Sequence, residues 1–138
     1  MGKKMEKALL MAYDVVNQQN IPVLYLNKKL SDVQIVTELL SVKASLENGK
    51  LENGNLNEGE FKRISEVSGK LYELPLYFCD ISDNIDQLKQ TIKVLFENEG
   101  VKILFIDYEI EDEEYVIELK KDTTIPIIAI PYKSQTSI

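Results

Sequence analysis

The sequence predicts an α/β fold in which a mainly parallel sheet is covered by helices on both faces. Segments with apolar residues at helical spacing alternate along the chain with short apolar runs. These runs are apolar at consecutive positions rather than at alternate ones, which is typical of strands buried on both faces. The order of the strands in the sheet cannot be read from the sequence.

The clearest run is Val-Lys-Ile-Leu-Phe-Ile-Asp-Tyr at residues 101–108. It is too short for a separate helix, it follows Gly100, and it ends abruptly in the carboxylate of Asp107. Asp107 is therefore expected at the carboxyl end of a strand, where ligands bind in open α/β sheets. There it could hold Mg²⁺ through water, accept a phosphoryl group or cap the following turn.

The first third of the chain predicts helix, strand, helix. Apolar residues recur at helical spacing over residues 3–19. Ile21 precedes a proline and so favours extended backbone, which leads into a strand at 23–26. Ser31 and Gln34 form a capping-box pattern ahead of a helix that continues to residue 46.

Residues 47–57 form the loosest part of the chain, with two Asn-Gly pairs that mark turns. Asn57 and Glu60 then predict the start of a helix that Pro75 stops. The apolar side of this helix is expected to carry Phe61, Ile64, Val67 and Leu71. A short strand follows at 76–79.

The last third begins with a helix from Asn84 that Gly100 closes, followed by the Asp107 strand. Residues 109–114 predict a strongly acidic turn, and residues 115–121 predict a short helix. Residues 125–130 form the last predicted strand. The polar tail at 131–138 is expected to fray.

The composition fits one soluble domain spanning residues 1–138, with a net charge of −7. An acidic chain is repelled by phosphate backbones, so autonomous DNA binding is not expected. The chain has no histidine and a single cysteine, Cys79, which argues against a zinc site and an internal disulfide and fits a reducing cytoplasm. It has no apolar run near the ~20 residues of a membrane span, and no secretory signal pattern is expected.

Several stretches, taken in order, resemble the C-terminal RecA-like ATPase domain of DnaB-type replicative helicases. The matching stretches are Ile21-Pro22-Val23-Leu24 with Ser31, Gly54-Asn55-Leu56, Gly69-Lys70-Leu71-Tyr72-Glu73-Leu74-Pro75-Leu76-Tyr77, Ile85-Asp86-Gln87-Leu88, Ile103-Leu104-Phe105-Ile106-Asp107-Tyr108 and Ile125-Pro126-Ile127-Ile128-Ala129-Ile130. The resemblance runs over residues 2–135 in the order of the family. It implies a three-layer α-β-α fold with a RecA-like, P-loop NTPase-like core, present here as a single truncated domain.

In that family, the strand that resembles residues 103–108 carries the Walker B acid, so the resemblance assigns Asp107 to Mg²⁺. It assigns Gly2, Lys3 and Lys4 to a remnant of the phosphate-binding P-loop. A complete P-loop needs a preceding strand, a glycine-rich loop, and a lysine followed by a hydroxyl residue at a helix start. Here the strand and the first glycines are absent, and Lys4 occupies the hydroxyl position.

Other departures fall on the family's catalytic positions. The catalytic glutamate aligns with Lys29, which cannot polarise an attacking water. The glutamine after the Walker B acid aligns with Ile110, and a later Ser-Gln pair gives way to Pro131-Tyr132. A following arginine is replaced near Gln135. The resemblance therefore implies a degenerate domain without catalytic residues. We expect no cofactor, or Mg-ATP if the remnant site still works.

Simpler interpretations stand beside these assignments. Asp107 could be a relic or a turn cap, and Gly2-Lys3 a basic terminus without a ligand. Lys28 and Lys29 could contact an acidic partner or be solvated. The acidic turn could be a patch for a basic partner or a solvated loop. Cys79 is expected to be a small buried apolar residue.

The preferred functional hypothesis is a catalytically inactive interaction or assembly module linked to DNA replication. Its partner would be a replicative helicase subunit or a second copy, bound at a sheet edge left open beside the last strand. One alternative is a residual ATP-binding ATPase of the helicase class. Another is a receiver-like signalling domain, although Asn27-Lys28-Lys29 stands where receivers carry paired acids.

Overall fold

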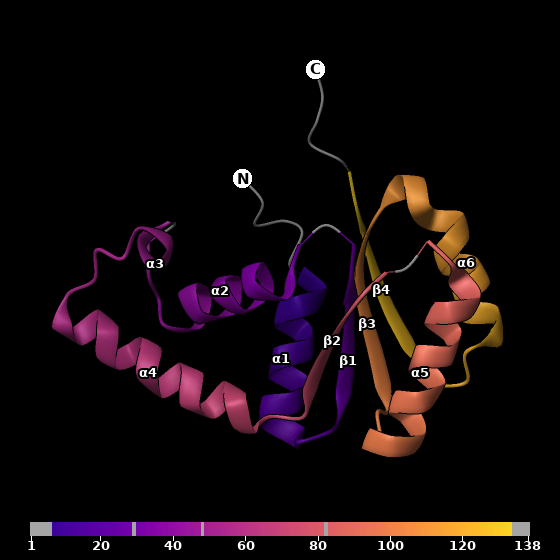
Figure 1. Cartoon of the computed structure of the whole chain (residues 1–138), viewed down its shortest axis with the longest axis horizontal. Coiled ribbons are helices and arrows are strands. Elements are labelled where there is room, and N and C mark those ends of the chain that lie inside the picture. Colours follow the sequence, from indigo (N-terminus) through magenta and orange to yellow (C-terminus); the bar gives the residue numbers. More distant parts are fainter. Residues whose placement is uncertain (1–6, 29, 48, 82, 134–138) are drawn as a thin grey trace. The chain divides into compact units, whose positions relative to one another are not determined.

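A computed structural model of the chain describes residues 7–28, 30–47, 49–81 and 83–133 (Figure 1). The elements in chain order are α1 Lys7–Gln19, β1 Val23–Asn27, α2 Asp32–Lys43, α3 Lys50–Asn53, α4 Glu58–Glu73, β2 Leu76–Asp80, α5 Ile85–Glu99, β3 Ile103–Glu109, a 3₁₀ helix at Ile110–Asp112, α6 Glu113–Asp122 and β4 Ile127–Tyr132. The chain divides into two compact units, residues 1–28 with 75–138, and residues 29–74.

The first unit is built on a parallel sheet with the strand order β2-β1-β3-β4. Figure 1 shows α1 on one face of this sheet and α5 and α6 on the other. The predicted α/β architecture with helices on both faces is confirmed. β1 and β3 are the inner strands, and β2 and β4 are the edges among the described residues.

Both faces of the inner strands are buried, as their continuous apolar runs predict. Leu26 of β1 and Ile106 of β3 belong to a core cluster with Leu88 of α5 and Leu119 of α6. The alternate residues, which include Tyr25, point to the opposite face, where α1 packs. This alternation places Asp107 on the α1 face.

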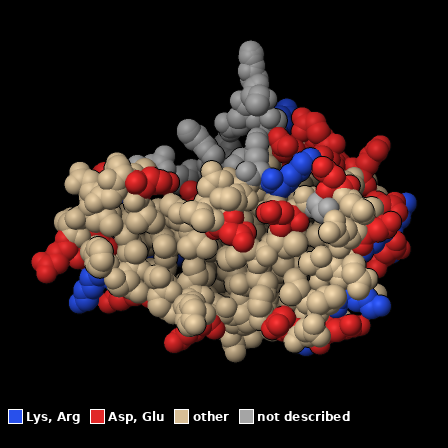
Figure 2. All heavy atoms as spheres, viewed as in Figure 1, with Lys and Arg blue, Asp and Glu red and all other residues tan. Residues whose placement is uncertain are grey.

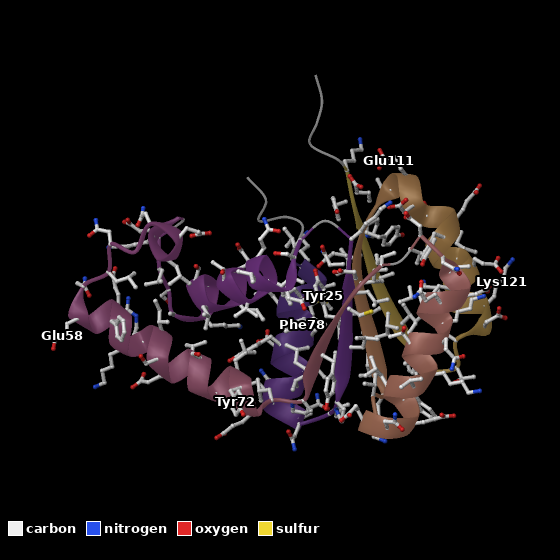
Figure 3. The ribbon with its side chains drawn as sticks, in the orientation of Figure 1. Tyr25, Glu58, Tyr72, Phe78, Glu111 and Lys121 are labelled. Atoms are coloured by element: carbon white, nitrogen blue, oxygen red, sulfur yellow. The ribbon has the colours of Figure 1, made fainter. Side chains whose placement is uncertain are left out.

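The second unit consists of α2, α3 and α4. The predicted capping boxes of α2, at Ser31 and Gln34, and of α4, at Asn57 and Glu60, are both present. No residue of α4 is buried, and Tyr72 at its C-terminal end is 90% exposed (Figure 3). On the predicted apolar side of α4, Ile64, Val67 and Leu71 are therefore half-buried, whereas Phe61 is exposed.

Three local expectations need correction. The loose segment contains a short helix, α3, between two glycines with positive φ, and the acidic turn is a 3₁₀ helix that continues into α6. Strand β4 extends through Pro131 and Tyr132, so the expected fraying is wrong for those two residues. Tyr132 is 9% exposed and pairs with Glu109, which explains why the strand continues.

No helix in the described ranges is both long enough and apolar enough to cross a membrane.

Candidate functional site

Asp107 lies near the carboxyl end of β3, and its carboxylate accepts hydrogen bonds from three donors. The backbone N–H of Ala8 donates to Oδ1 at 3.0 Å, and that of Leu9 donates to Oδ2 at 3.2 Å. The Tyr25 hydroxyl donates to Oδ2 at 2.7 Å. The side chain is 1% exposed. Asp107 therefore joins the two inner strands to the first described turn of α1.

Tyr25 is held in place by packing as well as by its hydrogen bond to Asp107. It is fully buried in β1, and its ring meets that of Phe78 edge-on, with centroids 6.4 Å apart (Figure 3). Its hydroxyl oxygen also accepts from Asn27 Nδ2 at 3.0 Å. Asn27, Tyr25 and Asp107 thus form a buried polar chain that begins at the end of β1.

Two opposing influences set the pKa of Asp107. Burial raises the pKa to about 6 because the carboxylate loses its hydration. The Tyr25 hydroxyl and the N–H groups of Ala8 and Leu9 lower it, since they donate to the charged form. Burial is the larger influence, so the pKa of Asp107 lies at about 6, above its usual value.

This chain of polar groups occupies the topological switch point of the sheet. β1 and β3 are neighbours, and the chain leaves β1 toward β2 and leaves β3 toward β4 on the other side. Ligands bind outside the strand ends at such a point. Here the first described turn of α1 meets the carboxylate directly, so the place is filled by the chain itself.

The described geometry does not fit an Mg²⁺ ion at Asp107. Magnesium requires near-octahedral oxygen coordination and keeps several of its waters. Both oxygens of Asp107 already accept hydrogen bonds, and the group has almost no exposed surface. In the described ranges, no group of three or more acidic or cysteine side chains could hold a metal ion.

Of the other site residues predicted from sequence, only some lie among the described residues. Gly2, Lys3, Lys4, Lys29 and Gln135 lie outside the described residues. Ile110 is 42% exposed in the 3₁₀ helix after β3.

The acidic turn and the edge strand β2 hold two further candidates. Lys28 Nζ forms an exposed ion pair with Asp112 at 3.3 Å, so part of the acidic turn is neutralised within the chain. Cys79 is half-buried rather than buried, because it lies on β2 at the edge of the sheet.

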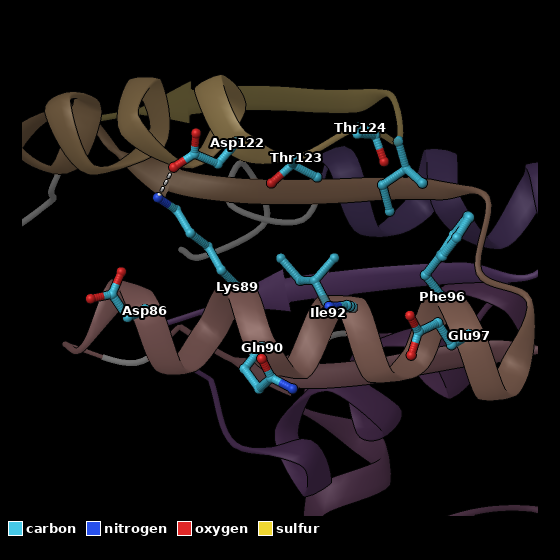
Figure 4. Close-up of a pocket in the computed structure, with 11 residues that line it drawn as sticks. Asp86, Lys89, Gln90, Ile92, Phe96, Glu97, Asp122, Thr123 and Thr124 are labelled. Atoms are coloured by element: carbon cyan, nitrogen blue, oxygen red, sulfur yellow. Dashed lines mark hydrogen bonds and ion pairs between the residues drawn. The ribbon is translucent and has the colours of Figure 1, made fainter.

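A concave surface lies between α5 and the segment after α6, and has a volume of about 440 Å³ (Figure 4). Ile92 and Phe96 of α5 point into it, and Lys89 Nζ pairs with Asp122 at 2.6 Å across it. This ion pair raises the pKa of Lys89 and lowers that of Asp122. None of the candidate site residues predicted from sequence lines this cavity.

The fold is that of RecA-like helicase ATPase domains. It matches a DnaB-like replicative helicase, described with its interactions with primase, with a TM-score of 0.71 and 13% identity, over 96% of this chain and 37% of that one. It also matches a second solved structure, described as an ATPase domain, with a TM-score of 0.69 and 13% identity, over 96% of this chain and 55% of that one.

The family is shown by sequence. The family described as "DnaB-like helicase C terminal domain" matches residues 1–115, and the chain belongs to this family. The replicative DNA helicase DnaB of Treponema pallidum is 26% identical over 102 residues, which cover 73% of this chain and 23% of the relative. The DnaB of a Nostoc species is 26% identical over 144 residues, which cover 92% of this chain and 16% of the relative. The chain thus spans less than a quarter of the length of these relatives.

Strand order alone would not have decided between the family and the receiver-like alternative. The order β2-β1-β3-β4 also occurs in flavodoxin-like sheets, the class to which receivers belong. The family match, which includes the helices of the second unit, makes the distinction.

Proposed function

We propose that this chain is a catalytically inactive DnaB-like domain that serves as a protein-interaction or assembly module in DNA replication. The observation that carries the proposal is the state of Asp107. The resemblance assigns this carboxylate to Mg²⁺, but here it binds the backbone of α1 and the hydroxyl of Tyr25.

Loss of catalysis follows from what phosphoryl transfer requires. The reaction depends on positioned phosphates, a metal ion and an oriented water, with little covalent chemistry by the protein. The resemblance aligns lysines, Lys4 and Lys29, with the family's hydroxyl and glutamate positions. Asp107 is also buried and bonded to three donors of the chain, so we propose that three contributions to the transition state are lost together.

The surface favours a protein partner over DNA. Acidic side chains gather over the start of α6 (Figure 2), where Glu109, Glu111, Asp112, Glu113 and Glu114 follow one another closely. A net charge of −7 repels a phosphate backbone. We propose a replicative helicase subunit or a second copy of this chain as the partner, in the cytoplasm, where Cys79 stays reduced.

Calorimetric titration with Mg-ATP tests the loss of nucleotide binding. We expect no saturable heat up to millimolar ligand, for the chain itself and for Asp107→Ala alike. The fold of the variant is checked by circular dichroism. Saturable binding by the chain that Asp107→Ala abolishes would contradict the proposal and support the alternative of a residual ATPase.

Co-migration with a purified replicative helicase on size exclusion tests the interaction role. We expect a complex that weakens when Glu111 and Glu114 are changed to lysine. The matched control is the same change at Glu58 and Glu66, which lie on α4 in the other unit. If the chain forms a complex neither with the helicase nor with itself, the interaction role fails.

A further inference from the structure

The outer edge of β4 presents unpaired backbone groups. β4 pairs with β3 on one side, and no described strand pairs with its other side. The backbone N–H of Leu104 donates to the carbonyl of Pro126 at 3.0 Å, while Leu104 itself is in register with Ile127. In a parallel ladder the residues flanking the opposite position make the bonds. The N–H and C=O groups of Ile127 and Ala129 therefore point away from the sheet.

Pro131 shares this outward direction, since it lies two residues after Ala129. A proline has no N–H, and within sheets it is tolerated where that position faces outward. The open edge thus offers two donors, at Ile127 and Ala129, and one further acceptor at Pro131. Pairing along this edge is confined to a short segment.

The edge is apolar and uncharged. Residues 123–132 contain no charged side chain, and the four residues from Ile127 to Ile130 are all partly exposed. Natural proteins protect an open edge with lysines, inward-pointing charges or a covering element. Among the described residues, β4 has none of these apart from Pro131, and Lys133 follows the strand directly. An apolar edge with free backbone groups favours pairing with another strand.

We infer that β4 pairs with β4 of a second copy in an antiparallel register centred on Ile128, joining two sheets into one. This inference rests on the proposed interaction role and names its partner. In this register Ile127 of each copy lies opposite Ala129 of the other. Each such pair exchanges two hydrogen bonds, so the outward groups of both residues are satisfied.

Side chains agree with this register on both faces. Ile127 and Ala129 point toward the core cluster under α5 and α6, so a large residue faces a small one across the pair. On the α1 face, Ile128 meets its own copy, and such β-branched cross-strand pairs are favourable. The prolines fall outside the hydrogen-bonded centre, where the loss of a donor costs least.

Hydrogen exchange measured by NMR at low and high protein concentration tests the pairing. We expect the amides of Ile127 and Ala129 to slow at least tenfold as a dimer forms. The amides of Ile128 and Ile130 serve as internal controls, because they point toward β3 and are protected at both concentrations. Dimerisation should also strengthen with added salt, since two copies of net charge −7 repel each other.

Cysteine cross-linking tests the register. In a Cys79→Ser background, Ile128→Cys should form a disulfide between copies, because residues that meet on the dyad have Cβ atoms about 5 Å apart. Ile130→Cys is the matched control on the same face. In this register the two cysteines at position 130 would lie about 13 Å apart, at roughly 3.3 Å per residue, and should not cross-link.

Three results would overturn the inference. They are a monomer at all concentrations, concentration-independent protection of Ile127 and Ala129 in a monomer, and a dimer in which these amides still exchange fast. A monomer that nevertheless binds the replicative helicase would overturn only the self-pairing and leave the proposed interaction role standing.

Discussion

The hydroxyl of Tyr25 donates a 2.7 Å hydrogen bond to Oδ2 of Asp107, although the two residues are separated by 82 positions in the sequence. The bond connects the inner strands β1 and β3 on the face covered by α1. A phenol that donates to a buried carboxylate stabilises its charged form. Asp107, the acid at the switch point, is thereby held by a side chain of the neighbouring strand.

Tyr25→Phe should destabilise the chain by about 1.5–3 kcal/mol, because it removes one hydrogen bond to a buried charged group. It should also raise the pKa of Asp107 above about 6, since the Tyr25 hydroxyl is among the groups that lower it. Urea unfolding and an NMR titration of the carboxyl measure the two effects. Tyr72→Phe is the control, because Tyr72 is 90% exposed. An unchanged stability and pKa in Tyr25→Phe would disprove the role of this bond.

The pKa of Asp107 predicts a specific dependence of stability on pH. The folded-state pKa is raised from 3.8 to about 6, so the folded chain holds this proton more tightly than the unfolded chain does. The stabilising contribution is complete below pH 4 and is lost as the pH rises through about 6. The loss amounts to about 3 kcal/mol, since one pKa unit is worth about 1.4 kcal/mol.

The measurement compares the chain with Asp107→Asn by urea unfolding between pH 4 and pH 7. The lowered pKa values of Glu60 and Asp122 affect both proteins equally and cancel in the difference. Relative to the variant, the chain should lose stability as the pH rises. A difference that stays flat or grows with pH would show that burial does not dominate at Asp107.

Two glycine-to-alanine changes should have opposite effects. Gly100 closes α5 with a φ of 72°, so Gly100→Ala should cost about 1–2 kcal/mol through backbone strain alone. Gly69 lies inside α4 in open space, so Gly69→Ala should stabilise by about 0.5–1 kcal/mol. Thermal unfolding measures both. Equal effects of the same sign would contradict the helix ends described here.

Much of the fold can be predicted because its signals are local. Capping boxes at Ser31 and Asn57, the helix stop at Gly100 and the apolar strand runs each depend on a few neighbouring residues, and the structure confirms them. The expected open edge at the last strand also agrees with the position of β4 among the described residues. The short helix α3 escapes prediction, because one turn leaves no periodicity to detect.

Of the residues that form the site, only Asp107 could be predicted from the sequence. Asp107 stands out because it ends an apolar run, but its donors Ala8 and Leu9 lie 99 and 98 positions away. Their proximity depends on strand order and on the placement of α1, neither of which a single sequence reveals. Tyr25 and Asn27 give a weak indication of the site, because they are polar residues in a strand otherwise expected to be apolar.

The most direct test of the central claim is an NMR titration of the Asp107 carboxyl with Mg²⁺, in the presence and absence of ATP. If the carboxylate is held by α1 and Tyr25, its chemical shift and its pKa of about 6 should not change at millimolar Mg²⁺. A saturable shift accompanied by a fall in the pKa would mean that Asp107 binds the metal, and that the domain retains the nucleotide site of its family.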